Sequence, residues 1–135
     1  MKTNVLVLCT GNACRSQMAE GWLRALRSDV CDVQSAGIEA HGVNATAVEI
    51  MAEVGIDISQ HQSTVIDGAM IEWATLVITV CGHADEACPT LPQRVKRIHW
   101  PTPDPAALTG TPEEVRAGFR AVRDSLKARI TDLLI

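Results

Sequence analysis

Residues suited to nucleophilic chemistry stand together near the start of the chain. The run Cys9-Thr10-Gly11-Asn12-Ala13-Cys14-Arg15-Ser16 directly follows the apolar stretch 4–8. Backbone N–H groups of such a loop, placed before a helix, converge on the oxygens of an anion. The planar guanidinium of Arg15 adds a fork that binds two oxygens at once. The run therefore predicts a site where a tetrahedral oxyanion lies above the sulfur of Cys9.

The other positions of this loop suit the same task. A thiol ionises more readily beside a helix N-terminus and a cation, and Cys9 has both neighbours. We expect Gly11 to adopt the positive φ that a ring of N–H groups requires. We expect Asn12 to brace the loop and Ser16 to donate its hydroxyl to the Cys9 thiolate. Residues 10–16 would hold the anion, and Cys14 is assigned no catalytic role among them.

A carboxyl group is a candidate general acid. Asp104 lies in the proline-rich run 100–105, after the predicted strand 95–99. This places it at the same edge of the sheet as Cys9. An oxygen that leaves an attacked oxyanion needs a proton, which a positioned carboxyl group supplies. An Asp-Pro pair is by itself more often a turn device, but the edge shared with Cys9 favours the acid.

Two more cysteines follow a later apolar strand. Cys81 comes directly after the predicted strand 75–80, and adjacent strands lie about 4.8 Å apart. Because a disulfide needs Cα atoms roughly 4.4–6.8 Å apart, Cys9 and Cys81 could join after a modest loop movement. The alternative is a buried thiol at a strand end. Cys31, inside another predicted strand, is expected to belong to the core.

Cys88 requires a conformational change. If residues 82–87 are helical, Cys81 and Cys88 lie about 10.5 Å apart along the helix axis. A disulfide between them then needs the segment to unwind, and Gly82 and Pro89 at its ends favour such a change. The alternative is that Cys88 is an isolated surface thiol.

Apolar strands alternate with amphipathic helices along the whole chain. The pattern predicts strands at 4–8, 31–36, 75–80 and 95–99. It predicts helices that begin at Ser16, cover 47–54 before Gly55, cover 67–73, and begin at Thr111. This alternation predicts one α/β domain over residues 1–135, with a four-stranded parallel sheet in the order 2-1-3-4 and helices on both faces. In that order the chain reverses between the first and third strands, where ligands bind.

Composition narrows the classes of function. A net charge of -4 over 135 residues gives no support for nucleic-acid binding. No apolar run reaches the roughly 18 residues of a membrane span, and the absence of a basic leader predicts a cytoplasmic protein. Five cysteines, an odd number, favour reactive thiols over a disulfide framework. We expect a monomer.

These motifs resemble those of the thioredoxin-coupled arsenate reductases, which share the fold of the low-molecular-weight protein tyrosine phosphatases. The similarity covers nearly all of the chain. It is strongest in five stretches: Val7–Gly21, Ser35–Glu39, Gly55–Ser59, Val80–Pro89 and His99–Pro105.

The resemblance implies that arsenate is reduced to arsenite by a relay of thiols. Arsenate binds in the loop, Cys9 attacks arsenic, and Asp104 protonates the departing oxygen. Cys81 then attacks Cys9, so that arsenite leaves and a Cys9–Cys81 disulfide remains. Cys88 attacks Cys81, and thioredoxin reduces the resulting disulfide. No metal or organic cofactor takes part, and phosphate or sulfate would compete for the loop.

One departure concerns a potassium site that some relatives form with an Asn, a Glu, a Ser and an Asp. Asn12, Glu20 and Ser35 match three of these, but Thr64 stands at the Asp position. A potassium site built from the three would be weak, and potassium dependence stays open. His61 is expected to steady Asn12 or Ser35 instead, or to be a surface histidine.

Two other functions remain open. A phosphatase uses the same loop, but a tyrosine phosphatase needs aromatic walls, and this chain has no Tyr and one Phe. A non-enzymatic redox switch could report oxidation through Cys81 and Cys88, but it would not need Arg15 or Asp104. A carrier of phosphate on Cys9 would leave Cys88 unexplained. The reductant also stays open between thioredoxin and a glutathione–glutaredoxin system.

Overall fold

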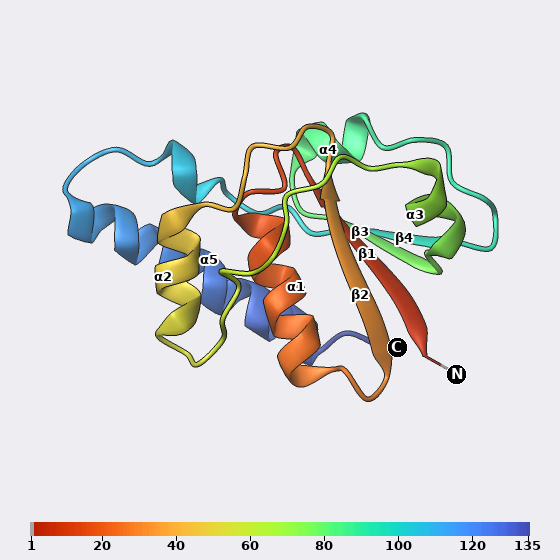
Figure 1. Ribbon diagram of the computed structural model, residues 1–135, viewed down its shortest axis with the longest axis horizontal. Coiled ribbons are helices and arrows are strands. Elements are labelled where there is room, and N and C mark those ends of the chain that lie inside the picture. Colours follow the sequence, from red (N-terminus) through yellow and green to blue (C-terminus); the bar gives the residue numbers. More distant parts are fainter. Residues whose placement is uncertain (1) are drawn as a thin grey trace.

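The computed structural model describes residues 2–135, which contain one parallel sheet (Figure 1). Its strands follow the spatial order β2-β1-β3-β4, and every neighbouring pair is parallel. This confirms the predicted sheet and its order. The strands are β1 (Thr3–Cys9), β2 (Cys31–Gly37), β3 (Leu76–Thr79) and β4 (Lys96–His99).

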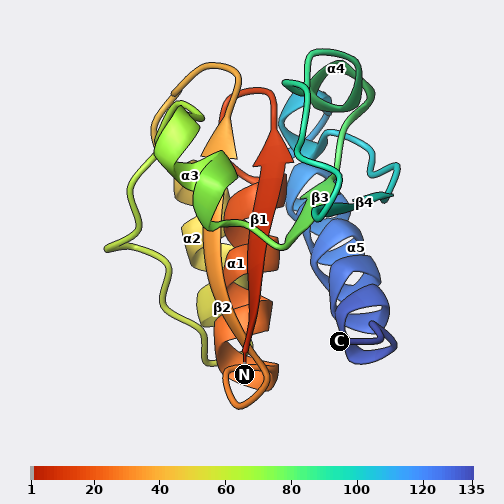
Figure 2. The ribbon, with the colours of Figure 1, turned by 90° about the vertical axis from the view of Figure 1, so that its right-hand side faces the viewer.

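Helices cover both faces of this sheet, as the alternating pattern predicts. In Figures 1 and 2, α1, α2 and α5 lie on one face and α3 lies on the other, while α4 stands beyond the end of β3. The helices are α1 (Arg15–Leu26), α2 (Ala45–Ala52), α3 (Gly68–Trp73), α4 (Gly82–Glu86) and α5 (Pro112–Thr131), with a short 3-10 helix η1 at Pro105–Ala107. None of the helices formed by residues 2–135 has the length and apolar character of a membrane span.

Local capping decides where the helices begin. The Thr111 side chain accepts a hydrogen bond from the N–H of Glu114, the Glu114 carboxylate accepts one from the N–H of Thr111, and Pro112 occupies the first helical position. The end of α2 differs from the prediction. The helix stops at Ala52, and the exposed side chain of Val54 lies outside the core.

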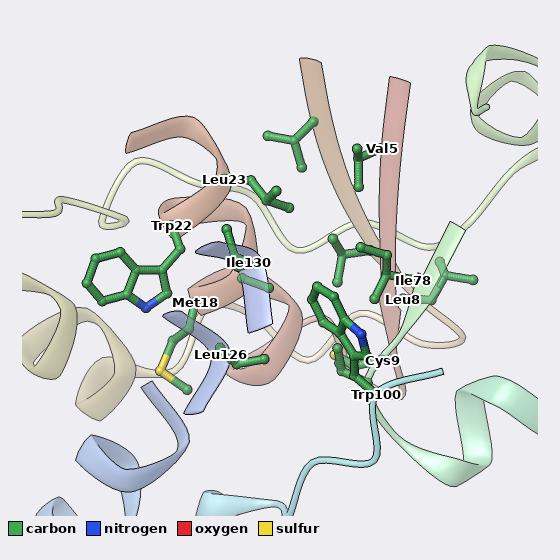
Figure 3. Close-up of a cluster of buried hydrophobic side chains, with 14 of the residues drawn as sticks. Val5, Leu8, Cys9, Met18, Trp22, Leu23, Ile78, Trp100, Leu126 and Ile130 are labelled. Atoms are coloured by element: carbon green, nitrogen blue, oxygen red, sulfur yellow. The ribbon is translucent and has the colours of Figure 1, made fainter. Parts of the chain in front are cut away.

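The core fills the space between the sheet and α1 and α5. Met18, Trp22 and Leu23 of α1 face Leu126 and Ile130 of α5 (Figure 3). Full burial of one such aliphatic side chain contributes about 1.5–3 kcal/mol to folding. These contacts hold α1, and therefore the loop that precedes it, in a fixed position against the sheet.

The strand register brings the candidate site residues to one edge of the sheet. Leu8 of β1 lies beside Thr79 of β3, which in turn lies beside His99 of β4. The segments after these three strands therefore leave the sheet at the same edge. They carry Cys9, Cys81 and Asp104.

Candidate active site

The loop between β1 and α1 is held from outside by the segment that follows β2. The carbonyl oxygens of Cys9, Thr10 and Gly11 accept hydrogen bonds from the N–H groups of residues 38, 39 and 41, at 3.2, 2.8 and 2.9 Å. In an anion-binding loop the carbonyls turn outward in this way and the N–H groups face the ligand.

The residue with a positive φ is Asn12, not Gly11. Asn12 has a φ of 48°, so the conformation predicted for Gly11 is wrong. Asparagine is one of the few side chains that enter the left-handed region readily. Gly11 lies under the His41 ring instead, and a Cβ atom there would lie 2.2 Å from Nδ1 of His41, so a larger residue requires that ring to move.

Asn12 braces the loop through its buried side chain. Its Nδ2 group donates to the hydroxyls of Ser16, at 2.8 Å, and of Ser35, at 3.0 Å. Its Oδ1 atom accepts a hydrogen bond from the N–H of Thr64 at 2.9 Å. Three polar contacts from three segments thus fix the strained backbone of Asn12.

The sulfur of Cys9 is buried at the base of the loop. The Oγ atom of Ser16 lies 2.8 Å from it. Because this Oγ atom already accepts a hydrogen bond from Asn12, the Ser16 hydroxyl proton is free to point at the sulfur. A donor in this place stabilises the thiolate form of Cys9.

Arg15 has a donor group without a partner. Its Nη1 group donates to the carbonyl of Thr102 at 3.1 Å, and its Nη2 group lies 3.8 Å from the Oδ2 atom of Asp104. Its Nε–H group is buried and has no hydrogen-bond partner among the described residues. A buried unsatisfied donor costs about 1–3 kcal/mol, so this group indicates a place for a ligand that accepts hydrogen bonds.

A cavity of about 200 Å³ opens above Cys9. This volume suits an inorganic oxyanion. A larger hollow of about 370 Å³ between β4 and the end of α5 contains no cysteine. The smaller cavity is lined by Cys9, Thr10, Gly11, Ala13, Cys14, Arg15, His41, Asp104 and Ala106.

Asp104 caps a turn and also lines the cavity. Its Oδ1 atom accepts a hydrogen bond from the N–H of Ala106 at 3.0 Å and caps η1. Its Oδ2 atom faces Arg15, and 42% of its side chain is exposed. The structure therefore places a carboxyl group at the wall of the cavity, where it can deliver a proton to a leaving oxygen.

Two other thiols are kept neutral by their surroundings. Burial raises the pKa of Cys14 to about 11, and the nearby Asp104 and Cys9 add repulsion against a second negative charge. Burial also raises the pKa of Cys31, which lies in β2. Both remain thiols near pH 7, so neither competes with Cys9 as a nucleophile.

Cys81 contacts the loop that contains Cys9. Its sulfur lies 3.2 Å from the hydroxyl of Thr10, the residue after Cys9. β3 ends at Thr79, one residue before the predicted end, so Val80 separates Cys81 from the strand. Cys81 is the N-cap of α4, and its sulfur accepts a hydrogen bond from the N–H of Ala84 at 3.3 Å.

Cys88 lies beyond the opposite end of α4. It is half-buried, and this burial raises the pKa of its thiol. With α4 helical, Cys81 and Cys88 are separated by roughly 10 Å along the helix axis. Both sulfurs are free thiols, and α4 lies between the two residues in the chain.

The three residues suggested for potassium share one chain of hydrogen bonds. Asn12 donates to Ser35, and the Ser35 hydroxyl donates to the Oε1 atom of the buried Glu20 at 2.7 Å. The Oε2 atom of Glu20 lies 3.1 Å from Arg24 Nε and 3.3 Å from His61 Nδ1. These nitrogen donors already occupy the oxygens that a cation would need, so the group does not fit a potassium ion.

Two histidines lie near the site. The contacts of one differ from the prediction, and the other was not predicted to be there. His61 contacts Gln17 and Glu20 and not Asn12 or Ser35, so its predicted role is wrong. His41 lines the cavity, and its Nε2 atom lies 2.6 Å from Glu39. No local pattern marks His41, because its position depends on the packing of the 38–41 segment over Gly11.

Comparison with known proteins identifies the family. Residues 4–135 match the family described as low molecular weight phosphotyrosine protein phosphatase. A protein named arsenate reductase from Halalkalibacterium halodurans is 54% identical over 129 residues, which cover 96% of this chain and 93% of that protein. An arsenate reductase from Bacillus subtilis is 52% identical over 128 residues, which cover 95% of this chain and 92% of that protein.

Solved structures give the same result. An arsenate reductase in the phosphate binding state superposes with a TM-score of 0.78 at 35% identity, covering 98% of this chain and 95% of that one. The YwlE arginine phosphatase from Geobacillus stearothermophilus superposes with a TM-score of 0.76 at 31% identity, covering 96% of this chain and 88% of that one. The chain thus belongs to the low molecular weight phosphotyrosine protein phosphatase family.

Proposed function

We propose that this protein reduces arsenate to arsenite by a relay of three thiols that thioredoxin regenerates. The observation that carries the proposal is the contact between the Cys81 sulfur and the hydroxyl of Thr10, 3.2 Å away, next to the nucleophile Cys9. A hydrolase needs only the loop. A second buried thiol beside the loop, followed by a third across a short helix, suits electron transfer.

The first step forms a bond between sulfur and arsenic. Arsenate binds with its oxygens on the loop N–H groups and on Arg15, whose unpaired Nε–H supplies a further donor. The Cys9 thiolate attacks arsenic, and one oxygen leaves as water after Asp104 gives it a proton. Ser16 steadies the thiolate before the attack.

The second step is the reduction. The Cys81 thiolate attacks the Cys9 sulfur, the sulfur–arsenic bond breaks, and its electron pair goes to arsenic, which leaves as arsenite. A Cys9–Cys81 disulfide remains. The Cys88 thiolate then attacks the Cys81 sulfur and releases Cys9, and the dithiol of thioredoxin supplies two electrons to the Cys81–Cys88 disulfide.

Several features support this reading over the two alternatives. Among residues 2–135, the cavity walls carry no Phe, Trp or Tyr side chain on which a tyrosine ring could stack, which disfavours a tyrosine phosphatase. A redox switch has no use for the unpaired donor of Arg15. The relatives named arsenate reductase are 54% identical over 129 residues and 52% identical over 128 residues. The proposal includes a monomer in the cytoplasm, where thiols are kept reduced.

An arsenite-release assay tests the proposal. The protein is supplied with arsenate and either thioredoxin with its reductase and NADPH, or glutathione with glutaredoxin. We expect sustained arsenite release with thioredoxin, abolished by Cys81→Ser and retained by Cys31→Ser. Turnover with glutathione alone would show a different reductant, and arsenite release by Cys81→Ser at the normal rate would contradict the relay.

A further inference from the structure

We propose that Asp85 is a latch that holds α4 in its helical form and so keeps Cys88 away from Cys81 until the relay needs them to meet. This inference rests on the relay described under the proposed function. Asp85 is a positioning residue, because it acts through α4 and touches neither the anion nor the reacting sulfurs.

The carboxylate of Asp85 joins α4 to β3 and β4. Figure 2 shows α4 beyond the end of β3. The Oδ1 atom of Asp85 accepts hydrogen bonds from Arg97 of β4, at 2.8 Å to Nη2 and 3.2 Å to Nε. It also accepts one from the hydroxyl of Thr79 of β3 at 2.9 Å. The Arg97 guanidinium reaches the main-chain carbonyl of Asp85 as well. One arginine thus holds both the side chain and the backbone of the helix.

The donors around Asp85 are fixed in turn by β4. Nδ1 of His99 lies 2.8 Å from the hydroxyl of Thr79. Because the Thr79 hydroxyl gives its proton to Asp85, it accepts from the His99 ring. An isolated exposed ion pair contributes little to stability. The Asp85 cluster stabilises α4 more than such a pair would, because one carboxylate accepts hydrogen bonds from donors on two strands.

A helix as short as α4 needs contacts with the rest of the protein to stay helical. It has five residues, and isolated helices under about 12 residues are marginal in water. Four side-chain contacts hold it: the buried Ala84, the cap by the Cys81 sulfur, the His83 Nδ1 atom 3.2 Å from the Thr10 hydroxyl, and the Asp85 cluster. When Cys81 enters a disulfide with Cys9, the sulfur moves away from Ala84 and the cap is lost. The Asp85 cluster is then the main tie that remains.

Charged groups near Cys88 also affect the reactivity of its thiol. The pKa of Asp85 is lowered by its hydrogen bonds with Arg97 and Thr79, so Asp85 is ionised at neutral pH. Arg97 lowers the pKa of Cys88, whereas Asp85 raises it. In the helical form of α4, burial and the Asp85 carboxylate therefore both act against the Cys88 thiolate.

The test measures how readily Cys81 and Cys88 join in the absence of arsenate. In a Cys9→Ser background, diamide takes two electrons and two protons from the two thiols, forms the disulfide and becomes the hydrazine. The variants are Asp85→Ala and, as the matched control in the same helix, Glu86→Ala. Both changes raise helix propensity, so a lower intrinsic helix stability cannot explain faster disulfide formation. Glu86 is exposed and forms no ion pair within residues 2–135.

We expect Asp85→Ala to form the Cys81–Cys88 disulfide about tenfold faster than the parent and Glu86→Ala to stay within about twofold. Amide hydrogen exchange should show faster exchange at residues 85 and 87 in Asp85→Ala, with α5 unchanged. Equal rates in all three proteins would overturn the latch and leave the relay standing. No Cys81–Cys88 disulfide in any of them would overturn the relay itself.

A second variant tests the proposal in case Asp85→Ala does not fold. Arg97→Gln leaves the sequence of α4 intact and removes the same tie from β4. If Asp85→Ala loses its far-ultraviolet circular dichroism signal, Arg97→Gln is compared with Lys96→Gln, which changes an exposed neighbour in the same strand. Faster disulfide formation in Arg97→Gln alone supports the latch, and equal rates in the two contradict it.

Discussion

The hydroxyl oxygen of Ser16 lies 2.8 Å from the sulfur of Cys9, and it lies 2.8 Å from the Nδ2 group of Asn12 on its other side. The three side chains form a directed chain in which Asn12 donates to Ser16 and Ser16 donates to Cys9. Asn12 is itself fixed by Thr64 and Ser35. The nucleophile is therefore oriented by residues from three segments of the chain.

Removal of the Ser16 hydroxyl should slow the first chemical step. A hydrogen bond to a charged group contributes about 1.5–3 kcal/mol, so Ser16→Ala should lower the single-turnover rate of arsenite formation by roughly 10- to 100-fold. Rapid quench without thioredoxin measures this rate. Ser125→Ala, an exposed serine in α5, is the matched control and should leave the rate unchanged. An equal loss in both variants would contradict the role of Ser16.

Arg15→Lys should weaken anion binding. Lysine has no counterpart to the Nε–H group, and it cannot form the fork that binds two oxygens. We expect the affinity for phosphate, measured by titration calorimetry, to fall at least tenfold. Arg116→Lys changes an arginine in an exposed pair with Glu49 and should bind phosphate as the unaltered protein does. Unchanged affinity in Arg15→Lys would remove Arg15 from the binding site.

Asp104→Asn should separate binding from chemistry. Asparagine keeps an oxygen for the N–H of Ala106, so η1 stays capped, but it has no acidic proton to give. General acids contribute about 10²- to 10⁴-fold, and the single-turnover rate should fall within that range while phosphate affinity changes little. A normal single-turnover rate would exclude Asp104 as the proton donor.

Cys88→Ser should stop the cycle after one round. Cys9 and Cys81 can still reduce one arsenate, so one arsenite per protein should appear. The Cys9–Cys81 disulfide then persists, and thioredoxin should not support turnover. Cys31→Ser, which changes a buried thiol outside the site, should turn over normally. Sustained turnover by Cys88→Ser would refute the proposed order of attack.

Stability at low pH should depend on Glu53. Its hydrogen bonds to Arg120 and Arg123, which join α2 to α5, lower its pKa from 4.5 to about 2. A lowered pKa stabilises the fold above the ordinary value, and this stability is lost as the pH falls through the lowered one. Glu53→Gln should therefore unfold at a lower temperature than the unaltered protein at pH 7.

The difference in unfolding temperature caused by Glu53→Gln should shrink steadily between pH 4.5 and pH 2. Thermal denaturation followed by circular dichroism measures it. Glu86→Gln, an exposed carboxyl group in α4, is the control and should show no comparable difference at pH 7. A Glu53→Gln difference that stays constant down to pH 2 would contradict the assigned ion pairs.

Much of the fold follows from local pattern. The run of four buried apolar residues in β1 predicts a strand covered on both faces, and the box formed by Thr111 and Glu114 predicts the start of α5. The alternation of such elements predicts a parallel sheet with helices on both faces. The end of α2 was missed because Gly55 marks the turn after the helix and not its last residue.

The details of the site depend on contacts between distant segments. The sequence favours Gly11 for the positive φ, but Asn12 adopts it because Ser16, Ser35 and Thr64 all bind its side chain. The Asp85 cluster was missed for the same reason. Asp85 reads as an ordinary helix carboxylate until the sheet places Arg97 beside it.

The most direct test of the relay maps disulfides during turnover. The protein is mixed with arsenate and a limiting amount of thioredoxin, quenched in acid with an alkylating agent at successive times, and its peptides are analysed by mass spectrometry. We predict a Cys9–Cys81 linkage that appears first and decays as a Cys81–Cys88 linkage accumulates. Continuous arsenite release in samples that never contain the Cys81–Cys88 linkage would contradict the account.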